Sequence, residues 1–594
     1  MAELSTNSAI QAATASHQAG RWSEAEALYR QVLQAEPNHT DAMNLLGVLL
    51  GEQGRYEAAV DLIGRAVAAN PLVAEYHANL GETYRRMGKL EPAEASLRQA
   101  LELNPLHAEA QNNLGLVLKS RGLADQAIAA FSEAAKIRPD FVLAYNNLGI
   151  AWSEKREFEK ALSALKKSLE LNPDQADVYA NVGACLTWMK ELPEAIEACR
   201  KAISINPRFA EAHNNLGACL RMLGQYAEAA DEGAKAIELQ PSYSGAYSNL
   251  GDTLLHQGQI EKAIPLYRRA IELEPEYEET HKQLGTAYFL QGDLPRGFAE
   301  YEWRLTGDKA VIDSNIPQPR WDGGDLKGKT ILLHGEQGFG DVIQTARYVP
   351  LVAAKHGKIV IGCYPELLRL FADLPYVEKI TRIGETAPPF DVYCPFMSLP
   401  LAFGTTLLSI PAYVPYLQPK PELVQLWSQR LGPRNGKMRV ALAWAGRAEH
   451  DNDRNRSIRL NQLECLKDIP GVSFYSLQKG PPRAQIADSA FAGRLIDWTA
   501  DLNDFVDTAA LLANLDLLIA VDTSVAHLAG ALGKAVWILL PTPPDWRWML
   551  HRTDSPWYPT VRLFRQKRAG EWGEPISELC HALSMAGQQR APVV

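Results

Sequence analysis

The chain has 594 residues, too many for one hydrophobic core, so we expect about two to four domains. Its 46% hydrophobic and 22% charged residues are typical of a globular protein, and 60 Lys and Arg against 70 Asp and Glu give a net charge of −10. The acidic residues are spread along the chain, which argues against a protein that binds nucleic acid or a charged membrane surface.

The cysteines and the N-terminal segment bear on the compartment. Seven cysteines occur without CxxC spacing, which argues against a disulfide framework and against a structural zinc site. The N-terminus lacks a basic segment followed by an apolar one, and no run reaches the roughly 18 apolar residues of a membrane span. We therefore expect a cytoplasmic protein with no membrane span and no structural zinc site.

A period of 34 residues runs through the first half of the chain. It is kept by prolines at Pro37, Pro71, Pro105, Pro139, Pro173, Pro207, Pro241 and Pro275, and by glycines at Gly47, Gly81, Gly115, Gly149, Gly183, Gly217, Gly251 and Gly285. Alanines keep the same step from Ala25 to Ala263. A period this strict indicates a solenoid, and each unit resembles the tetratricopeptide repeat, in which small residues let paired helices pack closely and Pro ends the second helix.

We predict eight repeats from about residue 6 to 275 and a ninth, partial repeat to about 303, so that residues 6–303 form an α-solenoid. In the ninth repeat Gly297 replaces the packing alanine, and the sequence becomes aromatic in the segment FAEYEWRL. We interpret this unit as a capping repeat that docks on the next domain.

The pattern changes after an irregular linker at residues 304–328. Short apolar runs then alternate with helical stretches, which predicts parallel sheets. The predicted strands are Thr330–His334, Lys358–Cys363, Asp391–Cys394, Arg439–Trp444, Val472–Leu477, Asp516–Val521 and Val536–Leu540. A proline-rich stretch from Pro411 to Arg434 separates two Rossmann-like halves, residues 329–434 and 435–594, which we expect to face each other across a cleft.

A row of asparagines lies inside the solenoid. The same repeat position holds Asn79, Asn113, Asn147, Asn181, Asn215 and Asn249. Each carboxamide offers a donor and an acceptor, and first helices line the concave face, so the row suits the backbone of an extended protein segment. The alternative is that Asn is simply frequent at this position of such repeats.

The loop after the first predicted strand reads Gly335-Glu336-Gln337-Gly338-Phe339-Gly340-Asp341 and precedes a helix expected from about Val342 to Gly357. Gly338 and Gly340 would let the backbone approach a ligand, and Asp341 would project into the cleft as a candidate base. The alternative is that Asp341 caps the helix and the glycines form a tight turn.

Polar loops also follow two strands of the second half. Trp444 and Gly446 lead into a loop with Arg447, Arg454 and Arg456, while Gln478 and Lys479 follow another strand. Arginines beside a helix N-terminus bind phosphate well, so we assign the three arginines and Lys479 to phosphate recognition. We place Trp444, Gly446 and Gln478 in the same donor-binding site. The spacing Asp451-Asn452-Asp453 could hold a metal ion, but the nearby arginines compete for its carboxylates. A solvated side chain is the alternative for Lys479.

The stretch from Leu515 to Pro541 reads as a βαβ unit whose helix begins after the polar turn Asp522-Thr523-Ser524. A helix N-terminus offers unpaired N–H groups and a positive dipole, which suit a nucleotide diphosphate, and His527 would face the same cleft. Asp522, Ser524 and His527 do not form a hydrolase triad, because no G-x-S-x-G elbow is present. The alternative is a capped core helix.

With these motifs placed, residues from about 328 to 570 resemble the heptosyltransferase-like glycosyltransferases, chiefly in the Gly340-Asp341 turn and the segment DTSVAHLAGALG. The whole chain resembles a broad bacterial group of tetratricopeptide-repeat glycosyltransferases, some of which act on flagellin. The resemblance implies a GT-B fold with an acceptor-side first half, a nucleotide-sugar donor held by the second half, no metal or other cofactor, and inverting transfer.

The resemblance also implies residue roles. It makes Asp341 the catalytic base, and it places Asp522, Thr523 and His527 on the donor phosphates, with Ser524 where relatives often have Gly. An asparagine-laddered solenoid before a GT-B domain also resembles the O-linked N-acetylglucosamine transferase, which favours a protein acceptor.

Three functions follow as hypotheses. The first is a protein glycosyltransferase that holds its acceptor, for example flagellin, on the solenoid and transfers sugar to Ser or Thr. The second is a repeat scaffold or secretion chaperone whose transferase half is silent. The third is an enzyme that acts on lipopolysaccharide or another glycan.

Overall fold

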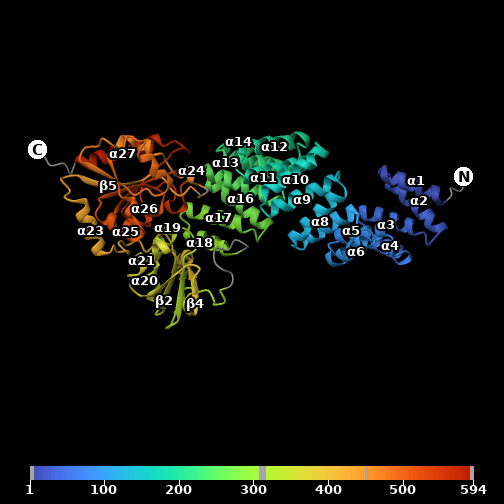
Figure 1. The fold of residues 1–594 in the computed structure, drawn as a ribbon, viewed down its shortest axis with the longest axis horizontal. Coiled ribbons are helices and arrows are strands. Elements are labelled where there is room, and N and C mark those ends of the chain that lie inside the picture. The colour runs from blue at the N-terminus through green and yellow to red at the C-terminus, as the bar shows by residue number, and fades with distance from the viewer. Residues whose placement is uncertain (1–5, 307–315, 449, 451, 589–594) are drawn as a thin grey trace. The chain divides into compact units, whose positions relative to one another are not determined.

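The computed structural model describes residues 6–306, 316–448, 450 and 452–588. The chain divides into two compact units, Met1–Pro241 and Ser242–Val594. Figure 1 shows paired helices up to α18 and two sheets in the later part of the chain. No helix among the described residues is both long enough and apolar enough to cross a membrane.

Seven helix pairs make up the described part of the first unit. They are α1 (Thr6–Gln18) with α2 (Trp22–Ala35), α3 (Thr40–Glu52) with α4 (Tyr56–Ala69), α5 (Ala74–Arg86) with α6 (Leu90–Leu103), α7 (Ala108–Ser120) with α8 (Ala124–Ile137), α9 (Val142–Glu154) with α10 (Phe158–Leu171), α11 (Ala176–Trp188) with α12 (Leu192–Ile205), and α13 (Ala210–Met222) with α14 (Tyr226–Leu239). Small residues allow the close pairing, because a Cβ at Gly47 would lie 2.4 Å from Cγ1 of Ile63. The predicted α-solenoid is confirmed.

The second unit begins with the last repeats, α15 (Ser244–His256) with α16 (Ile260–Leu273) and α17 (Glu278–Gln291) with the short α18 (Leu294–Tyr301), followed by the 3-10 turn η1 (Glu302–Leu305). A Cβ at Gly297 would lie 2.3 Å from Cδ1 of Phe289, so the aromatic ring explains why glycine replaces alanine in the ninth repeat. We call α17, α18 and η1 the terminal repeat. The predicted linker at 304–328 lies partly outside the described residues.

The first sheet is parallel, with strand order β3-β2-β1-β4. Its strands are β1 (Thr330–His334), β2 (Lys358–Cys363), β3 (Val377–Arg382) and β4 (Val392–Pro395). Helical segments between and after them are α19 (Phe339–Thr345), η2 (Ala346–Tyr348), α20 (Val349–Ala353), η3 (Pro365–Leu367), α21 (Leu368–Phe371), η4 (Phe396–Ser398) and α22 (Leu399–Ala402). The helix expected from Val342 to Gly357 is therefore three short pieces and begins earlier, at Phe339.

The second sheet is also parallel, with order β10-β9-β8-β5-β6-β7. Its strands are β5 (Met438–Ala443), β6 (Val472–Ser476), β7 (Leu495–Asp497), β8 (Leu517–Val521), β9 (Ala535–Leu540) and β10 (Val561–Arg565). The accompanying segments are α23 (Pro421–Leu431), α24 (Asp453–Arg456), η5 (Leu460–Leu466), η6 (Pro481–Ile486), η7 (Thr499–Asp501), α25 (Phe505–Ala513), α26 (Ser524–Ala531), η8 (Trp546–Trp548) and α27 (Gly573–Gln588). The two α/β halves predicted from the sequence are thus present.

Both sheets are doubly wound. In each, the chain starts at a central strand, adds neighbours on one side, and then returns to the other side of the first strand. The order therefore reverses between β1 and β4 and between β5 and β8. Ligands of such sheets bind at the carboxyl ends of the strands beside this reversal, so the loops after β1, β5 and β8 are the places to look for a site.

One cysteine pair departs from the sequence prediction. Cys465 in η5 and Cys580 in α27 form a disulfide, which the spacing of the cysteines did not indicate. The other five cysteines are free and buried. The sequence argued against a disulfide framework, and this single pair is a disulfide that it did not anticipate.

Candidate functional site

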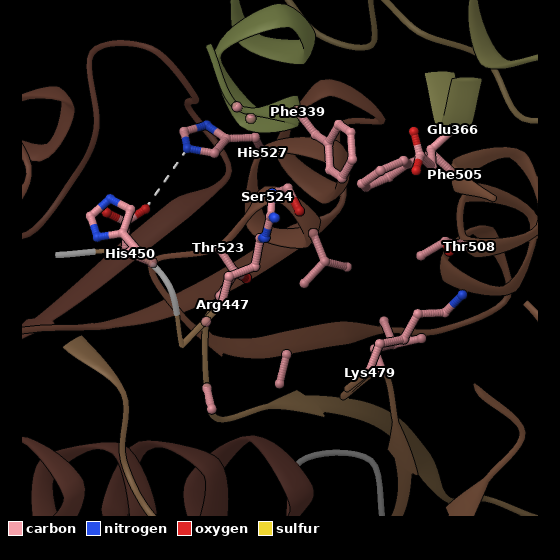
Figure 2. Close-up of a pocket in the computed structure, with 18 of the residues that line it drawn as sticks. Phe339, Glu366, Arg447, His450, Lys479, Phe505, Thr508, Thr523, Ser524 and His527 are labelled. Carbon is pink, nitrogen blue, oxygen red and sulfur yellow. Dashed lines mark ion pairs between the residues drawn. The ribbon is translucent and has the colours of Figure 1, made fainter. Parts of the chain in front are cut away.

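A cavity of about 730 Å³ lies at the carboxyl ends of the strands in the second unit. Segments from both halves line it: residues 337–341 after β1, 445–447 after β5, 477–479 after β6, 502–505 and 508 around the start of α25, 522–525 and 527 after β8, and Asp545 and Arg547 after β9. Its size is within the range of small-molecule sites. Figure 2 shows residues that line the cavity, with Phe339 next to Phe505.

The N-terminus of α26 opens into this cavity. Thr523 is the N-cap residue, and its side chain makes no capping hydrogen bond. Its Oγ1 atom is buried and has no hydrogen-bond partner among the described residues, and Thr523 and Ser524 both line the cavity. A buried hydroxyl without a partner costs free energy unless a ligand satisfies it. This geometry fits an anion with several oxygen atoms.

His527 and Asp522 lie together behind this helix end. The Nε2 atom of His527 is 3.8 Å from Oδ1 of Asp522, a contact that Figure 2 marks with a dashed line. Burial, aided by the positive charge of Arg547, lowers the pKa of His527 to about 3, so its imidazole is neutral at pH 7. Burial, followed by repulsion from Asp545, raises the pKa of Asp522 to about 7.

The other ring nitrogen of His527 has a partner. Its Nδ1 atom lies 3.0 Å from the Tyr558 hydroxyl. If the hydroxyl donates to Nδ1, the neutral ring carries its proton on Nε2, on the side of the cavity. His527 would then act on a ligand as a hydrogen-bond donor rather than as a cation.

Gly340 brings the two halves together at this point. A Cβ at Gly340 would lie 2.8 Å from Cδ2 of His527, so only glycine lets α19 approach α26 this closely. Gly340 lines the cavity, as does Gly338, but the closest group it faces is the histidine ring. The sequence suggested that Gly340 lets the backbone approach a ligand. The structure gives a second reason for this glycine, the close packing of α19 on α26.

Asp341 lies in α19 at the cavity wall. Its Oδ2 atom accepts a hydrogen bond of 2.7 Å from the Gly338 N–H, which is the capping arrangement considered as the alternative to catalysis. Its Oδ1 atom accepts from Nη2 of Arg547. Burial raises the pKa of Asp341, and Arg547 opposes that shift without cancelling it. The Asp341 carboxylate therefore both caps α19 and forms an ion pair with Arg547.

Arg547 is a site residue that the sequence reasoning missed. It is buried, and its guanidinium also donates to Asp545 Oδ1 at 2.8 Å and to Gln344 Oε1 at 2.7 Å. Burial alone would lower its pKa, but Asp341 and Asp545 outweigh burial and raise it. The segment after β9, Asp545-Trp546-Arg547-Trp548, follows a parallel strand at the same edge as the other loops, and this was the available signal.

Trp444 and Gln478 were predicted to contact the donor, and the structure places both in the protein framework. The ring of Trp444 is fully buried in the core of the second sheet, and Trp444 does not line the cavity. The Gln478 carboxamide accepts from the N–H groups of Trp444 and Ala445, and it donates to the carbonyls of Ala445 and Lys479. Gln478 borders the cavity but uses its amide to join two loops.

The predicted cations divide into two groups. Arg447, Arg456 and Lys479 line the cavity, whereas Arg454 is exposed on α24 and does not line it. Arg456 donates to the Asp522 carbonyl at 3.3 Å, and a Cβ at Gly446 would lie 2.5 Å from its Nη2, so Gly446 makes room for this guanidinium. Lys479 donates through Nζ to the Leu502 carbonyl, which holds it at the rim.

An aromatic group closes one side of the cavity and was not predicted. The rings of Phe339 and Phe505 are 5.3 Å apart in an edge-to-face arrangement, and Tyr364 packs edge-on against Phe339 at 5.2 Å. Glu366 lines the cavity beside them. Flat apolar rings with a nearby carboxylate suit a planar ring that carries hydrogen-bond donors, as a nucleobase does.

The terminal repeat contacts two loops of this site. The Phe289 ring stacks on Trp546 with centroids 4.3 Å apart, next to Arg547 in the chain. The Tyr301 hydroxyl lies 2.9 Å from Nε2 of Gln337, which lines the cavity. Arg304 makes two hydrogen bonds to the buried Glu336, at 2.9 and 2.8 Å.

All six asparagines of the predicted ladder are half-buried on first helices. Three of them donate to the preceding repeat: Asn79 to Asn44 at 3.1 Å, Asn147 to Asn112 at 2.9 Å, and Asn215 to the Ala180 carbonyl at 3.2 Å. Part of the ladder therefore joins neighbouring repeats. For Asn181 the described part of the chain supplies no side-chain hydrogen-bond partner, and Asn113 accepts from Asn112 at 3.4 Å.

The spacing that could have held a metal ion is only partly visible, because Asp451 lies outside the described residues. Asp453 accepts from the Ser457 hydroxyl at 2.7 Å and pairs with Arg456. Across the described segments, no group of three or more His, Cys, Asp and Glu side chains is arranged to hold a metal ion.

Comparisons with known proteins agree with this architecture for the helical part. Tetratricopeptide-repeat family models match residues 16–82, 78–141, 142–175, 176–209, 198–230, 234–264 and 251–292. The N-terminal helices are tetratricopeptide repeats.

A curated relative extends over part of the chain. Protein FlbA of Caulobacter vibrioides is 27% identical over 323 residues, which are 48% of this chain and 52% of FlbA. The match thus spans about half the length of this relative.

Solved structures similar to this chain include MamA, at 29% identity over 27% of this chain and 94% of MamA, with a TM-score of 0.25. YrrB, described as a tetratricopeptide-repeat protein with an unusual peptide-binding site, is 24% identical over 32% of this chain and 97% of its own, with a TM-score of 0.26. PilF of Pseudomonas aeruginosa is 22% identical over 35% of this chain and 94% of its own, with a TM-score of 0.32.

Proposed function

We propose that this protein is an inverting, metal-independent glycosyltransferase that moves a sugar from a nucleotide-sugar donor to a Ser or Thr hydroxyl of a protein acceptor. The observation that carries the proposal is the cavity at the reversal points of both sheets, into which the unpartnered Thr523 hydroxyl and the α26 N-terminus open. The family resemblance supports the same function, and we place the reaction in the cytoplasm, where nucleotide sugars are made.

The donor phosphates would lie at the α26 N-terminus. The Thr523 hydroxyl and the Ser524 N–H would donate to phosphate oxygens, with Arg447, Arg456 and Lys479 around the same cavity. Neutral His527 would add one N–H without adding charge. The aromatic group formed by Phe339, Phe505 and Tyr364 would hold the base.

Transfer would proceed in one displacement. The acceptor oxygen attacks the anomeric carbon and forms the new C–O bond, while the bond from that carbon to the phosphate oxygen breaks. The proton of the acceptor hydroxyl passes to Asp341, whose pKa burial raises. The electron pair of the broken bond stays on the departing phosphate, which the α26 N-terminus and the nearby cations stabilise.

The repeat solenoid would hold the protein acceptor. The half-buried asparagines, of which Asn181 has an unengaged carboxamide within the described chain, would bind backbone groups of an extended segment. Flagellin is the acceptor that the family resemblance suggests.

A silent repeat scaffold or chaperone is the second candidate. The observation that favours it is the ion pair between Asp341 and Arg547, because a carboxylate bound to arginine is a poor base. The third hypothesis, a glycan acceptor, keeps the same donor site and differs only in what the solenoid does.

Calorimetry with nucleotide sugars and nucleoside mono- and diphosphates tests the proposal. We expect the wild-type protein to bind one nucleotide class, Thr523→Val to bind it about tenfold more weakly, since a hydrogen bond to a charged group is lost, and Asp341→Asn to keep binding. A scaffold would bind none of these ligands in any variant.

The acceptor is identified separately. Intact masses of proteins that co-purify from the native cell should carry a sugar with the wild-type enzyme and lack it with Asp341→Asn. A glycan acceptor would instead leave every co-purified protein unmodified in both cases.

A further inference from the structure

The arginine between the two halves is the strongest unexplained feature of the cavity. Arg547 lines the cavity, is buried, and bonds to Asp545 and Asp341 and to the Gln344 amide. Its guanidinium also lies 4.4 Å from the centroid of the Trp546 ring. The N–H groups of a guanidinium lie in one fixed plane, so Arg547 fixes the positions of Asp341, Asp545 and Gln344 relative to one another.

The three bonds of Arg547 have different surroundings. Asp545 also lines the cavity, but it is two residues away in the same loop and accepts from the Arg547 N–H at 3.0 Å as well as from Nη1. Gln344 lies on α19 in the buried interior. The protein framework therefore fixes both of these bonds. The third bond, from Nη2, reaches Asp341 at the cavity wall. Both Nη atoms thus meet carboxylates that line the cavity, and the Nη2 bond is the one that joins Arg547 to a different segment of the chain.

The loop that carries Arg547 is fixed from outside the cavity. Trp546 stacks on Phe289 of the terminal repeat at 4.3 Å and meets Phe298 edge-on at 5.9 Å. Because these rings hold Trp546, the neighbouring Arg547 can exchange one hydrogen bond without a movement of its backbone. Large rearrangement of the loop is not needed.

From this geometry we propose that Arg547 binds the donor phosphate through Nη2 and that this bond replaces its bond to Asp341, so that Asp341 becomes available as a base only when donor is present. This inference rests on the proposed function, because it assumes a phosphate-bearing donor in the same cavity. Arg547 is then a phosphate-binding residue and, for Asp341, a positioning residue.

The exchange leaves Asp341 correctly oriented. Its Oδ2 atom keeps the hydrogen bond from the Gly338 N–H at 2.7 Å, while Oδ1 loses its partner and can accept the proton of the acceptor hydroxyl. The phosphate takes the place of the carboxylate oxygen on Nη2, while the Asp341 carboxylate stays nearby and its negative charge favours uptake of the acceptor proton. No proton needs to move for the exchange itself.

A double-mutant cycle with inorganic pyrophosphate as the probe tests the exchange in the full-length protein. Pyrophosphate should bind Asp341→Asn about tenfold more tightly than wild type, because the competing carboxylate is gone, and should bind Arg547→Gln about tenfold more weakly. In the double variant the gain from Asp341→Asn should disappear, because the two residues act through one bond.

Arg547→Lys repeats the cycle with the buried positive charge kept, in case Arg547→Gln fails to fold. Lysine has no planar fork, so it cannot hold its partners as the guanidinium does, and the gain from Asp341→Asn should shrink there too. Arg456→Gln is the matched control, since Arg456 contacts Asp453 and the Asp522 carbonyl instead, and its effect should add to that of Asp341→Asn.

Three results would overturn the proposal. If Asp341→Asn tightens pyrophosphate binding by the same factor with and without Arg547, the effect is through-space repulsion and no exchange takes place. If pyrophosphate binds to none of the variants, both this inference and the proposed donor site fail. A normal affinity in wild type with no gain in Asp341→Asn removes the exchange alone and leaves the donor site in place.

Discussion

Gly340 of α19 and His527 of α26 are in direct contact across the two α/β halves: a Cβ on Gly340 would lie 2.8 Å from Cδ2 of the histidine ring. The contact fixes the distance between α19, which carries Asp341, and α26, whose N-terminus would bind phosphate. Because the histidine is buried, its ring has little room to move away. The short distance between α19 and α26 thus depends on glycine at position 340, because any side chain there would meet the histidine ring.

Gly340→Ala should therefore lower stability by about 1–3 kcal/mol, the usual cost of overpacking a tight interior. Urea unfolding of the full chain measures it. Gly64→Ala is the matched control, because Gly64 lies within α4, a Cβ added there would have no heavy atom within 4 Å, and helix propensity predicts a gain of about 0.5–1 kcal/mol. Equal midpoints for Gly340→Ala and wild type would show that α19 can shift freely.

The asparagine ladder should divide into residues that stabilise the repeats and residues that bind. Asn147→Ala removes the bond to the buried Asn112 oxygen and should cost about 1–3 kcal/mol. Asn181→Ala should change stability little, because its carboxamide makes no side-chain hydrogen bond within the described chain, but it should weaken capture of the acceptor. Thermal unfolding and co-purification measure the two effects. A stability loss as large in Asn181→Ala as in Asn147→Ala would assign the whole ladder to structure.

The Asp522 carboxyl should make the folded protein less stable as the pH rises. Its folded-state pKa of about 7 lies above the ordinary value of 3.8, so the fold favours the protonated form and stability is lost as pH rises from about 4 towards 7. Asp545, Arg547, Arg456 and His527 surround this carboxyl, and His527, with its lowered pKa, contributes the opposite slope below about pH 6.5.

Comparison with Asp522→Asn isolates the carboxyl, because the contribution of His527 is present in both proteins. The variant should gain stability relative to wild type between about pH 5 and about pH 8, by at most about 3 kcal/mol, since each pKa unit is worth about 1.4 kcal/mol. Urea unfolding at both pH values measures it. A difference between the two proteins that is the same at both values would mean that Asp522 is ionised throughout.

The strands could be predicted where apolar runs are continuous. The bounds of β1 and β2 agree with the predicted ranges, whereas β3, β7 and β10 were missed. The sequence of β3, VEKITR, carries charges on an edge strand, β7 has only three residues, and β10, VRLFR, alternates with arginines at the other edge. An edge strand is buried less than a central one, so it lacks the signal on which the prediction depended.

The site was predictable where one loop follows one strand, as with Asp522 and Thr523 after β8. Trp444 shows where this fails, because side chains alternate along an extended chain: Ala443 and Ala445 line the cavity and Trp444 points into the core. Arg547 shows a second limit. Its contact with Asp341 joins the two halves, and no local pattern reports which distant loops meet.

The buried ion pair between the terminal repeat and the loop after β1 gives the last prediction. Arg304 and Glu336 are 4% and 5% exposed, and Glu336 also accepts from the Met397 N–H at 3.1 Å. Arg304→Met should cost about 3–5 kcal/mol, because it leaves a buried carboxylate without its cation. The double variant Arg304→Met with Glu336→Gln should recover a large part of this loss, since the Glu336 position then carries no charge and Glu302, the other partner of Arg304, keeps Arg320.

The exposed pair of Arg269 with Glu272, at 2.8 Å, supplies the control: Arg269→Met should leave the unfolding midpoint nearly unchanged. Urea unfolding of these variants and wild type gives the comparison. If the double variant is no more stable than Arg304→Met, the loss comes from the packing of the arginine side chain, and the ion pair does not hold the terminal repeat on the site.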